Sequence, residues 1–283
     1  MYIIADSGST KTEWCVLGDD GHCEVHHTSG INPVFLTREH IQELLVKEFD
    51  GRREGIKQVT FYGAGCAFEE KIRYVREVLM DFFGTPEVQV ESDLLGAARS
   101  LCGRKPGIAC ILGTGSNSCF YDGEKIAANV PSLGYILGDE GSGGALGKRL
   151  IADVLKGVLP QAIRDLFFKE YGYSYEELID RVYRQPLPNR FMAGMTGFLR
   201  KYIHIPAVEQ LVLDAFEGFV LRNILQYEAA RCYPVSFTGG IAYHFREQLE
   251  MVLKRNGLVL GTVSRAPMNG LVDYHRSLSV TRC

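Results

Sequence analysis

The sequence lacks the features that mark several large classes of protein. No apolar run approaches the roughly 20 residues that span a bilayer, so we expect no membrane partner. The opening MYIIADSGS has a short apolar core and no basic residue before it, so we expect no signal peptide. A basic excess is also missing, because 31 Lys and Arg face 34 Asp and Glu, which argues against a nucleic-acid partner. These absences favour a cytoplasmic globular protein.

Cysteine is present but forms no recognisable pattern. The eight cysteines include no Cys-x-x-Cys pair and no spacing typical of a metal site. We therefore expect most of them to be buried thiols, and the single tryptophan, Trp14, to lie in the core. The 283 residues are enough for one large domain or two smaller ones. What the sequence has in quantity is glycine, 31 residues, and its placement is informative.

Three segments repeat one local pattern, a short apolar run followed by a Gly/Ser/Thr loop. They are Tyr2–Ala5 with DSGSTKT, Ile108–Leu112 with GTGSNS, and Val235–Phe237 with TGGIA. After each of the first two loops the sequence predicts a strand, an Asp-Gly turn and a return strand. The same hairpin twice, about a hundred residues apart, suggests a duplicated unit. Coincidence stays the alternative, because Gly-rich loops after strands are common.

Helical patterns separate these blocks. The periodicity predicts helices over Thr37–Phe49 with Thr37 as N-cap, over Glu69–Phe83 ending at Gly84, over Leu146–Val158, after a capping box at Ser174–Glu177, and over about 206–232. We expect an α/β protein with one lobe over residues 1–107 and a larger, more helical lobe over 108–283. With no Pro/Ser-rich linker, the lobes are expected to pack around a cleft, and the last helix could pack back on the first lobe.

The glycine loops expose backbone N–H groups and hydroxyls that an anion can approach. Asp6 adds a carboxylate suited to Mg²⁺, while Thr10 and Lys11 add a hydroxyl and a positive charge. The alternative is that these loops are ordinary tight turns. Neither the Walker A pattern nor the Rossmann pattern is present, and the first two loops lead into strands, so a P-loop or Rossmann fold is not expected.

Two acidic positions stand out. Asp93 in ESDLLGAA follows an apolar run where a helix is expected to begin, so it is either a catalytic candidate or a helix N-cap. Asp139 in LGDEGSGG is surrounded by glycines, which suggests a helix entry capped by Asp or Ser, or a binding site for sugar hydroxyls or a metal-bound water. The histidines show no ligand spacing, so His26 and His27 are expected to have surface or hairpin roles.

Taken together, these segments resemble the actin/Hsp70/sugar-kinase superfamily, and within it the BadF/BadG-type ATPase family that includes N-acetylglucosamine kinases. DSGSTKT and GTGSNS are similar to its two phosphate motifs, SDLLGAA to the helix with the catalytic Asp, and LGDEGSGG to its G-D-E-G-S signature. FTGGIA resembles the adenosine motif, and APMNGLV resembles the closing segment. The resemblance implies a two-lobed actin-like ATPase (ribonuclease H-like) fold of duplicated β-sheet domains, with ATP and Mg²⁺ as cofactors and a small-molecule sugar as substrate.

The resemblance also assigns roles. It implies that Asp6 holds Mg²⁺ and that the phosphate-binding and adenosine-binding residues are Gly8, Thr10, Lys11, Gly113, Thr114, Gly115, Gly239 and Gly240. Sugar-contacting positions correspond to Asn32, Gly134 and Asp139 together with Asp93, which would accept the proton of the attacking hydroxyl. Ser7 and Ser9 replace glycines of the usual first motif, which narrows that loop.

The function expected from this resemblance is ATP-dependent phosphorylation of an amino sugar, with N-acetylglucosamine favoured and its primary 6-hydroxyl as acceptor. Two alternatives stay open. One is a BadF-type ATPase that activates a partner reductase, although such relatives bind an iron–sulfur cluster through cysteines and no compact cysteine pair occurs here. The other is a non-catalytic sugar or nucleotide sensor on the same fold. Superfamily kinases are often dimers, so the resemblance allows a homodimer.

Overall fold

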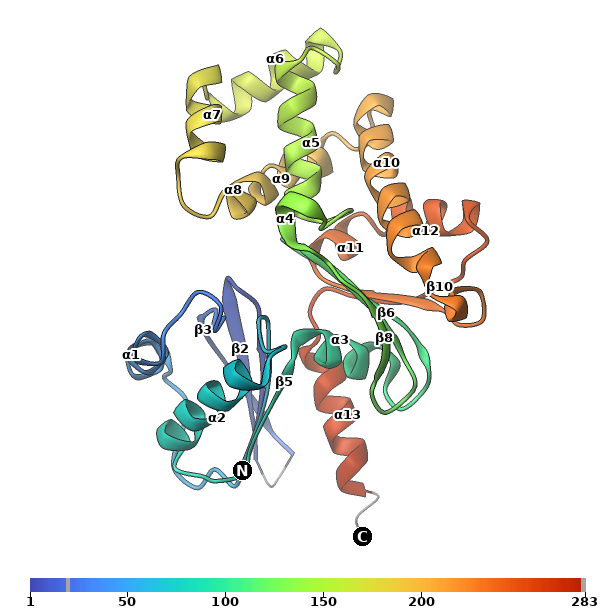
Figure 1. The fold of residues 1–283 in the computed structure, drawn as a ribbon. Coiled ribbons are helices and arrows are strands. Elements are labelled where there is room, and N and C mark those ends of the chain that lie inside the picture. Colours follow the sequence, from blue (N-terminus) through green and yellow to red (C-terminus); the bar gives the residue numbers. More distant parts are fainter. Residues whose placement is uncertain (19–20, 281–283) are drawn as a thin grey trace. The chain divides into compact units, whose positions relative to one another are not determined.

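The computed structural model describes residues 1–18 and 21–280 and divides into two compact units (Figure 1). The first unit comprises residues 1–105 and 123–125 and the chain from residue 266 onward, and the second comprises residues 106–122 and 126–265. The chain therefore returns to the first unit for its last helix. Each unit is built on one five-stranded sheet.

The sheet of the first unit contains three strands in antiparallel succession and two added in parallel. Its strands are β1 (Tyr2–Ser7), β2 (Lys11–Leu17), β3 (Cys23–Ser29), β4 (Gln58–Gly63) and β5 (Val88–Ser92). They lie in the order β3-β2-β1-β4-β5, with β1 parallel to β4 and β4 parallel to β5. The carboxyl ends of β1, β4 and β5 therefore lie at one edge of the sheet.

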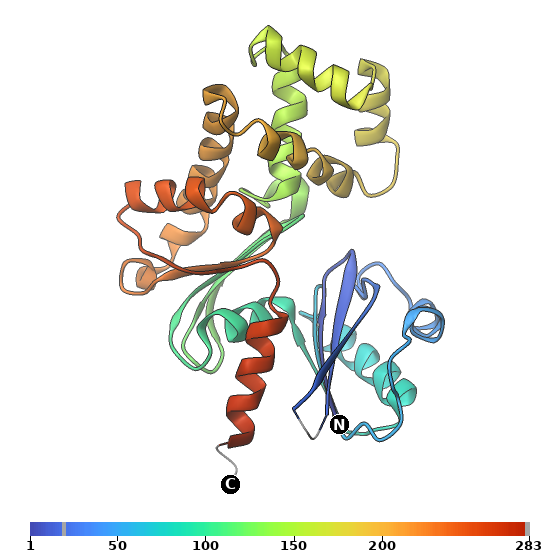
Figure 2. The same ribbon diagram turned by 180° about the vertical axis from the view of Figure 1, so that it is seen from behind.

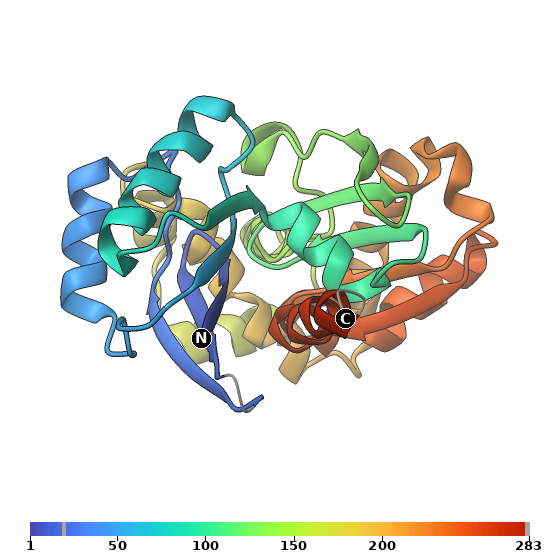
Figure 3. The same cartoon turned by 90° about the horizontal axis from the view of Figure 1, so that it is seen from below.

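Helices cover both faces of this sheet (Figure 2). They are α1 (Arg38–Glu48), α2 (Glu69–Phe83), α3 (Asp93–Cys102) and α13 (Met268–Val280). Ile3 and Ala5 pack with α1 and α2 on one face, where Trp14 is fully buried, as predicted. Ile4 points to the other face and packs with α13, which lies against α3 (Figure 3). This alternation is what a strand with both faces covered requires.

The second sheet repeats the first. Its strands are β6 (Gly107–Leu112), β7 (Ser116–Tyr121), β8 (Ile126–Val130), β9 (Val235–Thr238) and β10 (Leu260–Ser264), in the order β10-β9-β6-β7-β8. Here too a hairpin pairs antiparallel with the first strand, and the last two strands add in parallel on its other side. The duplicated unit predicted from the two hairpins is confirmed in the strand order.

The second unit is richer in helices, as expected. They are α4 (Gly134–Leu137), α5 (Gly143–Leu155), α6 (Gln161–Tyr171), α7 (Tyr175–Tyr183), α8 (Pro188–Gly194), α9 (Thr196–Lys201), α10 (Pro206–Arg222), α11 (Gly240–His244) and α12 (Arg246–Arg255). The prediction of one helix over 206–232 is wrong at its end. The α-helix stops at Arg222, and two short 3₁₀ segments, Ile224–Gln226 and Glu228–Arg231, follow.

Several helix ends fall where the sequence placed them. The Thr37 hydroxyl caps α1, Gly84 ends α2 in the left-handed conformation, and Ser174 forms the predicted capping box. At α3 the alternative of Asp93 as N-cap is wrong. The Ser92 hydroxyl accepts the Leu95 N–H and caps the helix, so Asp93 is its first residue and its carboxyl is not needed for capping.

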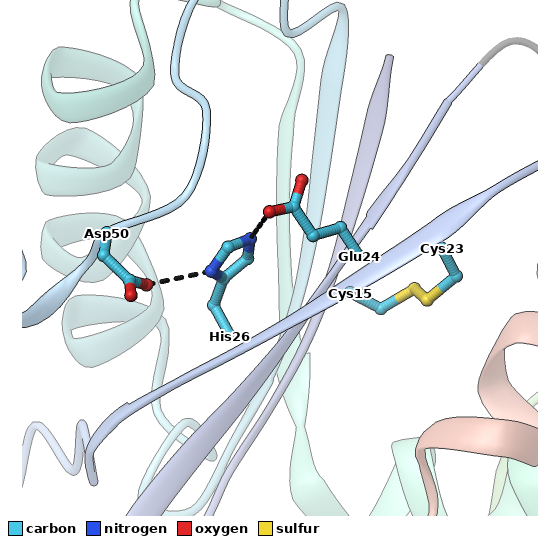
Figure 4. Close-up of polar contacts among 5 residues, drawn as sticks. All are labelled: Cys15, Cys23, Glu24, His26 and Asp50. Carbon is cyan, nitrogen blue, oxygen red and sulfur yellow. Dashed lines mark hydrogen bonds and ion pairs between the residues drawn. A yellow bond between two sulfur atoms is a disulfide. The ribbon is translucent and has the colours of Figure 1, made fainter.

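The expectation that most cysteines are buried thiols does not hold for one pair. Cys15 on β2 and Cys23 on β3 form a disulfide, because the hairpin sets their Cα atoms 5.8 Å apart (Figure 4). Of the other described cysteines, Cys66, Cys110 and Cys119 are buried, Cys102 is half-buried and Cys232 is exposed; Cys283 lies outside the described residues.

The hairpin β2–β3 also gives His26 a structural role. Its imidazole is buried between two exposed carboxylates, with Nδ1 2.8 Å from Asp50 Oδ1 and Nε2 3.2 Å from Glu24 Oε1 (Figure 4). The hairpin role expected for His26 therefore agrees with these contacts. Across the described part of the chain, no helix combines the length and the apolar character needed to cross a bilayer.

Candidate functional site

The first glycine loop joins β1 to β2 and packs against the residues that follow β3. The Ser7 hydroxyl is fully buried and lies 2.7 Å from Thr12 Oγ1, and it also accepts the Ile31 N–H at 2.9 Å. The Gly30 N–H donates to Thr10 O, and a Cβ on Gly30 would lie 2.3 Å from Gly8 O. Residues 8–11 are exposed. The loop is therefore fixed on one side and open on the other.

Asn32 lies next to this loop and is nearly buried. Its amide donates to Ser9 Oγ at 2.8 Å, and its carbonyl oxygen accepts the Val34 N–H at 3.0 Å. Gly65, which has a φ of 81°, packs directly on it, since a Cβ there would lie 2.3 Å from Asn32 Oδ1. The structure thus brings a predicted sugar-contacting residue against the predicted phosphate loop.

Asp6 and Asp93 lie at the same edge of the first sheet. Ser7 pairs with Gly63 on β4, and Gly63 pairs with Ser92 on β5, so the three strands end in register. Asp6 precedes Ser7 and Asp93 follows Ser92.

Both carboxyl groups hold their protons more tightly than usual. Burial, followed by repulsion from Asp93 and Glu13, raises the pKa of Asp6 to about 7. Burial raises the pKa of Asp93 to about 6, although its Oδ1 accepts the Leu94 N–H at 2.9 Å. Lys11 opposes the rise at Asp6. Neighbouring carboxyls with raised pKa values are typical of sites where a cation or a proton is exchanged.

The residues present fit ATP and a magnesium ion. Asp6 and Asp93 are half-buried carboxyls, and the charge of Asp93 raises the pKa of Asp6, so a divalent cation between them would reduce this repulsion. Mg²⁺ commonly binds through one or two carboxylates together with phosphates and water. Within residues 1–18 and 21–280 there is no cluster of three or more His, Cys, Asp or Glu side chains suited to a metal. An ion here would therefore need further ligands, namely the phosphate oxygens of ATP and water from solvent.

The second glycine loop joins β6 to β7 in the second unit and is braced by α5. The Gly143 N–H donates to Gly113 O at 2.8 Å, and the Gly144 N–H donates to Thr114 O at 3.0 Å. Ser142 caps the helix, as one alternative for this segment expected. The first N–H groups of α5 are thus used to hold the loop. The Gly113 N–H is used within the loop itself, where it donates to Gly115 O at 3.0 Å.

Asp139 is the second brace of this loop. Its backbone is left-handed, with a φ of 57°, and its Oδ1 accepts the Ser116 N–H at 3.0 Å. A Cβ on Gly115 would lie 3.1 Å from Asp139 Oδ2, so that glycine lets the carboxyl approach. Burial raises the pKa of Asp139, while the Ser116 N–H lowers it. Gly134 begins the neighbouring short helix α4, whose carboxyl end leads into Asp139.

The third glycine segment lies beside the second loop. Gly239 has a φ of 119°, which favours glycine, and a Cβ there would lie 2.3 Å from Leu112 O. Its N–H donates to Ser264 O at 3.0 Å, which ties β9 to β10. Gly240 begins α11 and has open space where a side chain would be. The arrangement leaves bare backbone, which a flat ring can approach.

The structure therefore gathers the predicted residues into two groups. The first unit holds those of the first phosphate loop with Asp6, Asn32 and Asp93, and the second unit holds Gly113–Gly115, Gly134, Asp139, Gly239 and Gly240. Sequence reasoning missed the residues that support them, namely Gly30, Gly65, Gly143 and Gly144. The sequence showed only that these residues are glycines. Their supporting role depends on contacts with another element or with a segment distant in the sequence.

No family model and no curated protein matches the chain. Among solved structures, a putative N-acetylglucosamine kinase from Porphyromonas gingivalis is 46% identical, with a TM-score of 0.94 over 98% of this chain and 99% of that one. A putative N-acetylglucosamine kinase from Chromobacterium violaceum is 18% identical, with a TM-score of 0.74 over 96% and 98%. MreB 5 of Spiroplasma citri, bound to AMPPNP, is 12% identical, with a TM-score of 0.58 over 99% and 96%.

The two weaker likenesses show the fold, which this chain shares with MreB. The stronger one extends over both units and supports membership of a kinase family. The chain therefore belongs to the BadF/BadG-type sugar kinases and ATPases of the actin/Hsp70/sugar-kinase superfamily.

Proposed function

We propose that this protein transfers the γ-phosphoryl group of ATP to the primary 6-hydroxyl of an N-acetylated amino sugar, with N-acetylglucosamine as the favoured substrate. The observation that carries the proposal is Asp93. Its carboxyl is half-buried at the first residue of α3, and no Lys, Arg or His nitrogen of the described residues lies within 4 Å of it. A carboxyl held in this way, with a pKa of about 6, is suited to accept a proton near neutral pH.

In the proposed reaction the sugar oxygen attacks the γ-phosphorus, the bond from phosphorus to the β-bridging oxygen breaks, and ADP leaves. The hydroxyl proton passes to the Asp93 carboxylate. Bound Mg²⁺ would neutralise phosphate charge, and Asp6 would hold it. Most of the rate should come from positioning and charge neutralisation, with the base contributing a smaller part. Thr10, Lys11 and Gly113–Gly115 supply hydroxyl, cationic and backbone groups for the phosphates.

The amino sugar is proposed from the polar groups around the two loops. The Asn32 amide and the Asp139 carboxyl are both largely buried, and both could hydrogen-bond sugar hydroxyls or an N-acetyl group. The solved structure with 46% identity is that of a putative N-acetylglucosamine kinase, which favours the same substrate here. The alternative of a partner-activating ATPase has no support from the cysteines, since three of the described thiols are buried.

The test is an ADP-release assay over hexoses, hexosamines and N-acetyl sugars, with ³¹P–¹H correlation spectra to locate the phosphate on the product. We expect turnover that depends on the sugar and falls by about 10²- to 10⁴-fold in Asp93→Asn, because a general base contributes that much. Asp81→Asn, which removes an exposed carboxylate paired with Arg38, is the matched control and should keep full activity. ATP hydrolysis that needs no sugar and persists in Asp93→Asn would refute the proposal.

A further inference from the structure

The segment that follows β3, residues 30–32, supports the first glycine loop. All three residues are buried, and each donates a hydrogen bond to an atom of residues 7–10. The Gly30 N–H donates to Thr10 O at 3.1 Å. The backbone of Gly30 also lies close to the loop, since a Cβ there would lie 2.3 Å from Gly8 O and 2.7 Å from Thr10 N. The position of this segment therefore sets the shape of the loop.

Ser29, the last residue of β3, is held from outside the sheet. Because β3 is an edge strand, the backbone groups on its outer side have no strand to pair with. Glu48, the last residue of α1, supplies the acceptor. Its Oε2 accepts the Ser29 N–H at 2.6 Å, and its Oε1 accepts the Ser29 hydroxyl at 3.1 Å. One carboxylate thus holds both donors of the residue from which the supporting segment starts.

The helix that carries Glu48 does not explain an acid at this position. A negative charge at the carboxyl end of a helix opposes the helix dipole, whereas the neighbouring Lys47 has the charge that is favoured there. The Ser29 N–H, followed by the Ser29 hydroxyl, lowers the pKa of Glu48, so this carboxylate is ionised near neutral pH. Its contacts with Ser29 therefore account for the acid.

The second unit holds the corresponding strand end with a different group. In its sheet the edge strand β8 takes the place of β3, and the last residue of β8 is Val130. The Tyr227 hydroxyl accepts the Val130 N–H at 2.9 Å and lies 2.8 Å from Ser118 Oγ on β7. Two unrelated side chains, Glu48 and Tyr227, thus meet the same need in the two copies. This repetition indicates that the end of the edge strand has to be fixed.

We propose that Glu48 is a positioning residue for the first glycine loop. By holding Ser29 it fixes Gly30 against residues 8–10, and in this way it sets how tightly the loop binds the phosphates of ATP. Glu48 acts only through Ser29 and does not touch the nucleotide. The inference rests on the proposed function, because it takes this loop to bind ATP.

The experiment is isothermal titration calorimetry of the full chain with AMPPNP and Mg²⁺, followed by kinetics of sugar-dependent ADP release. The variant is Glu48→Ala, and the matched control is Glu43→Ala, which removes an exposed carboxylate from the same helix. Glu48→Gln keeps an oxygen that can accept the Ser29 N–H, so it tests rescue. Urea unfolding gives the folded fraction of each variant, and hydrogen exchange over residues 29–32 reports the supporting segment directly.

We expect Glu48→Ala to bind AMPPNP at least about fivefold more weakly than Glu43→Ala, and Glu48→Gln to recover most of the affinity. The KM for ATP should rise by a similar factor while kcat changes less than about twofold, because the loop holds the phosphates both before and in the transition state. Hydrogen exchange over residues 29–32 should be faster in Glu48→Ala, and exchange over residues 113–118 should not change.

The proposal and the function on which it rests fail in different ways. Equal affinity for AMPPNP in Glu48→Ala and Glu43→Ala, or unchanged exchange over residues 29–32, would overturn the role of Glu48 and leave the proposed function intact. No saturable binding of AMPPNP by the unaltered chain would refute the ATP site itself, and the role of Glu48 with it.

Discussion

The two sheets share one strand order but carry different chemistry at the ends of their strands. The last β1–β2 pair joins Ser7 to Thr12 and the last β6–β7 pair joins Leu112 to Ser116, so Asp6 corresponds in position to Ile111. The first helical residue after the fifth strand differs in the same way. It is the half-buried Asp93 in α3 and the apolar, buried Met268 in α13.

The loops differ as well. In the first unit the loop is held by hydroxyl contacts of Ser7 and by Gly30, and its exposed side carries Thr10 and Lys11. In the second unit the loop is uncharged and is braced by the first N–H groups of α5 and by Asp139. Duplication of a fold therefore did not duplicate its chemistry. The first copy holds the paired carboxyls, and the second copy supplies a backbone cradle.

The largest expected effect on turnover among these predictions comes from replacing Asp6, an acidic residue with no acidic counterpart in the second sheet. Asp6→Asn should reduce sugar-dependent turnover by about 100-fold or more, because it removes the carboxylate proposed to hold Mg²⁺. Ile111→Val at the corresponding position should change turnover less than about threefold. Both are measured by ADP release across a Mg²⁺ titration. Full activity of Asp6→Asn at ordinary Mg²⁺ concentrations would contradict the proposal that the first unit alone supplies the carboxylate for Mg²⁺.

The next prediction concerns the backbone cradle of the second unit. Gly239→Ala should destabilise the protein by about 2–4 kcal/mol, because the residue has a φ of 119° and the new Cβ would lie 2.3 Å from Leu112 O. Gly84→Ala is the matched control, since Gly84 has a φ of 65° but open space around it, and should cost about 1 kcal/mol. Urea unfolding measures both. Equal losses would mean that the close approach to Leu112 is unimportant.

Much of this comparison was available from the sequence, for local reasons. The Asp-Gly turns and alternating runs predicted the two hairpins, and the hydroxyl caps at Thr37 and Ser174 act within three residues. Such signals are contained in a few neighbouring residues, so a single sequence carries them. The repeated hairpin predicted a duplicated unit, but it did not predict where the two parallel strands of each sheet lie.

The features that escaped prediction depend on distant contacts. Periodicity continues beyond Arg222, yet α10 ends there and 3₁₀ segments follow, so tertiary packing overrode the pattern. The Cys15–Cys23 bridge required the β2–β3 register, which spacing alone does not give. The braces at Gly30 and Gly65 involve segments more than 20 residues away along the chain.

The raised pKa values of the first unit predict a dependence of stability on pH. A carboxyl whose pKa is higher in the folded state than in the unfolded state stabilises the fold only while it is protonated, so stability falls as the pH rises from about 4 through its folded value. For Asp93 that value is about 6, against an ordinary 3.8. Asp93→Asn should therefore be more stable than the unaltered chain at pH 8, by at most about 3 kcal/mol.

This gain should fall below about 1 kcal/mol near pH 4, where the folded carboxyl is protonated and the unfolded one is about half protonated. Urea unfolding in EDTA, repeated from pH 4 to pH 8, gives the curve, and Asp81→Asn should show no comparable gain. Mg²⁺ with an ATP analogue should reverse the order at pH 8, because the bound ion stabilises the ionised carboxyls. If the gain in stability were the same at pH 4 and pH 8, ionisation of Asp93 could not be the cause of the destabilisation.

The smallest expected effects on stability are those of replacing Ser7 and Ser9, the two serines that stand where the family usually has glycine. Ser7→Ala should cost about 1–2 kcal/mol, because it leaves the buried Ile31 N–H and Thr12 hydroxyl with fewer partners. Ser9→Ala should change stability by less than about 0.5 kcal/mol, since its hydroxyl is on an exposed residue, where it accepts the Asn32 amide N–H. Its effect should instead be a change of up to about threefold in the KM for the sugar, if the Asn32 amide turns from Ser9 to the substrate. The corresponding position in the second unit, Leu112, is apolar, so the first loop depends on a buried hydroxyl where the second depends on packing. Equal stability losses for the two serine variants would show that this difference between the loops is not real.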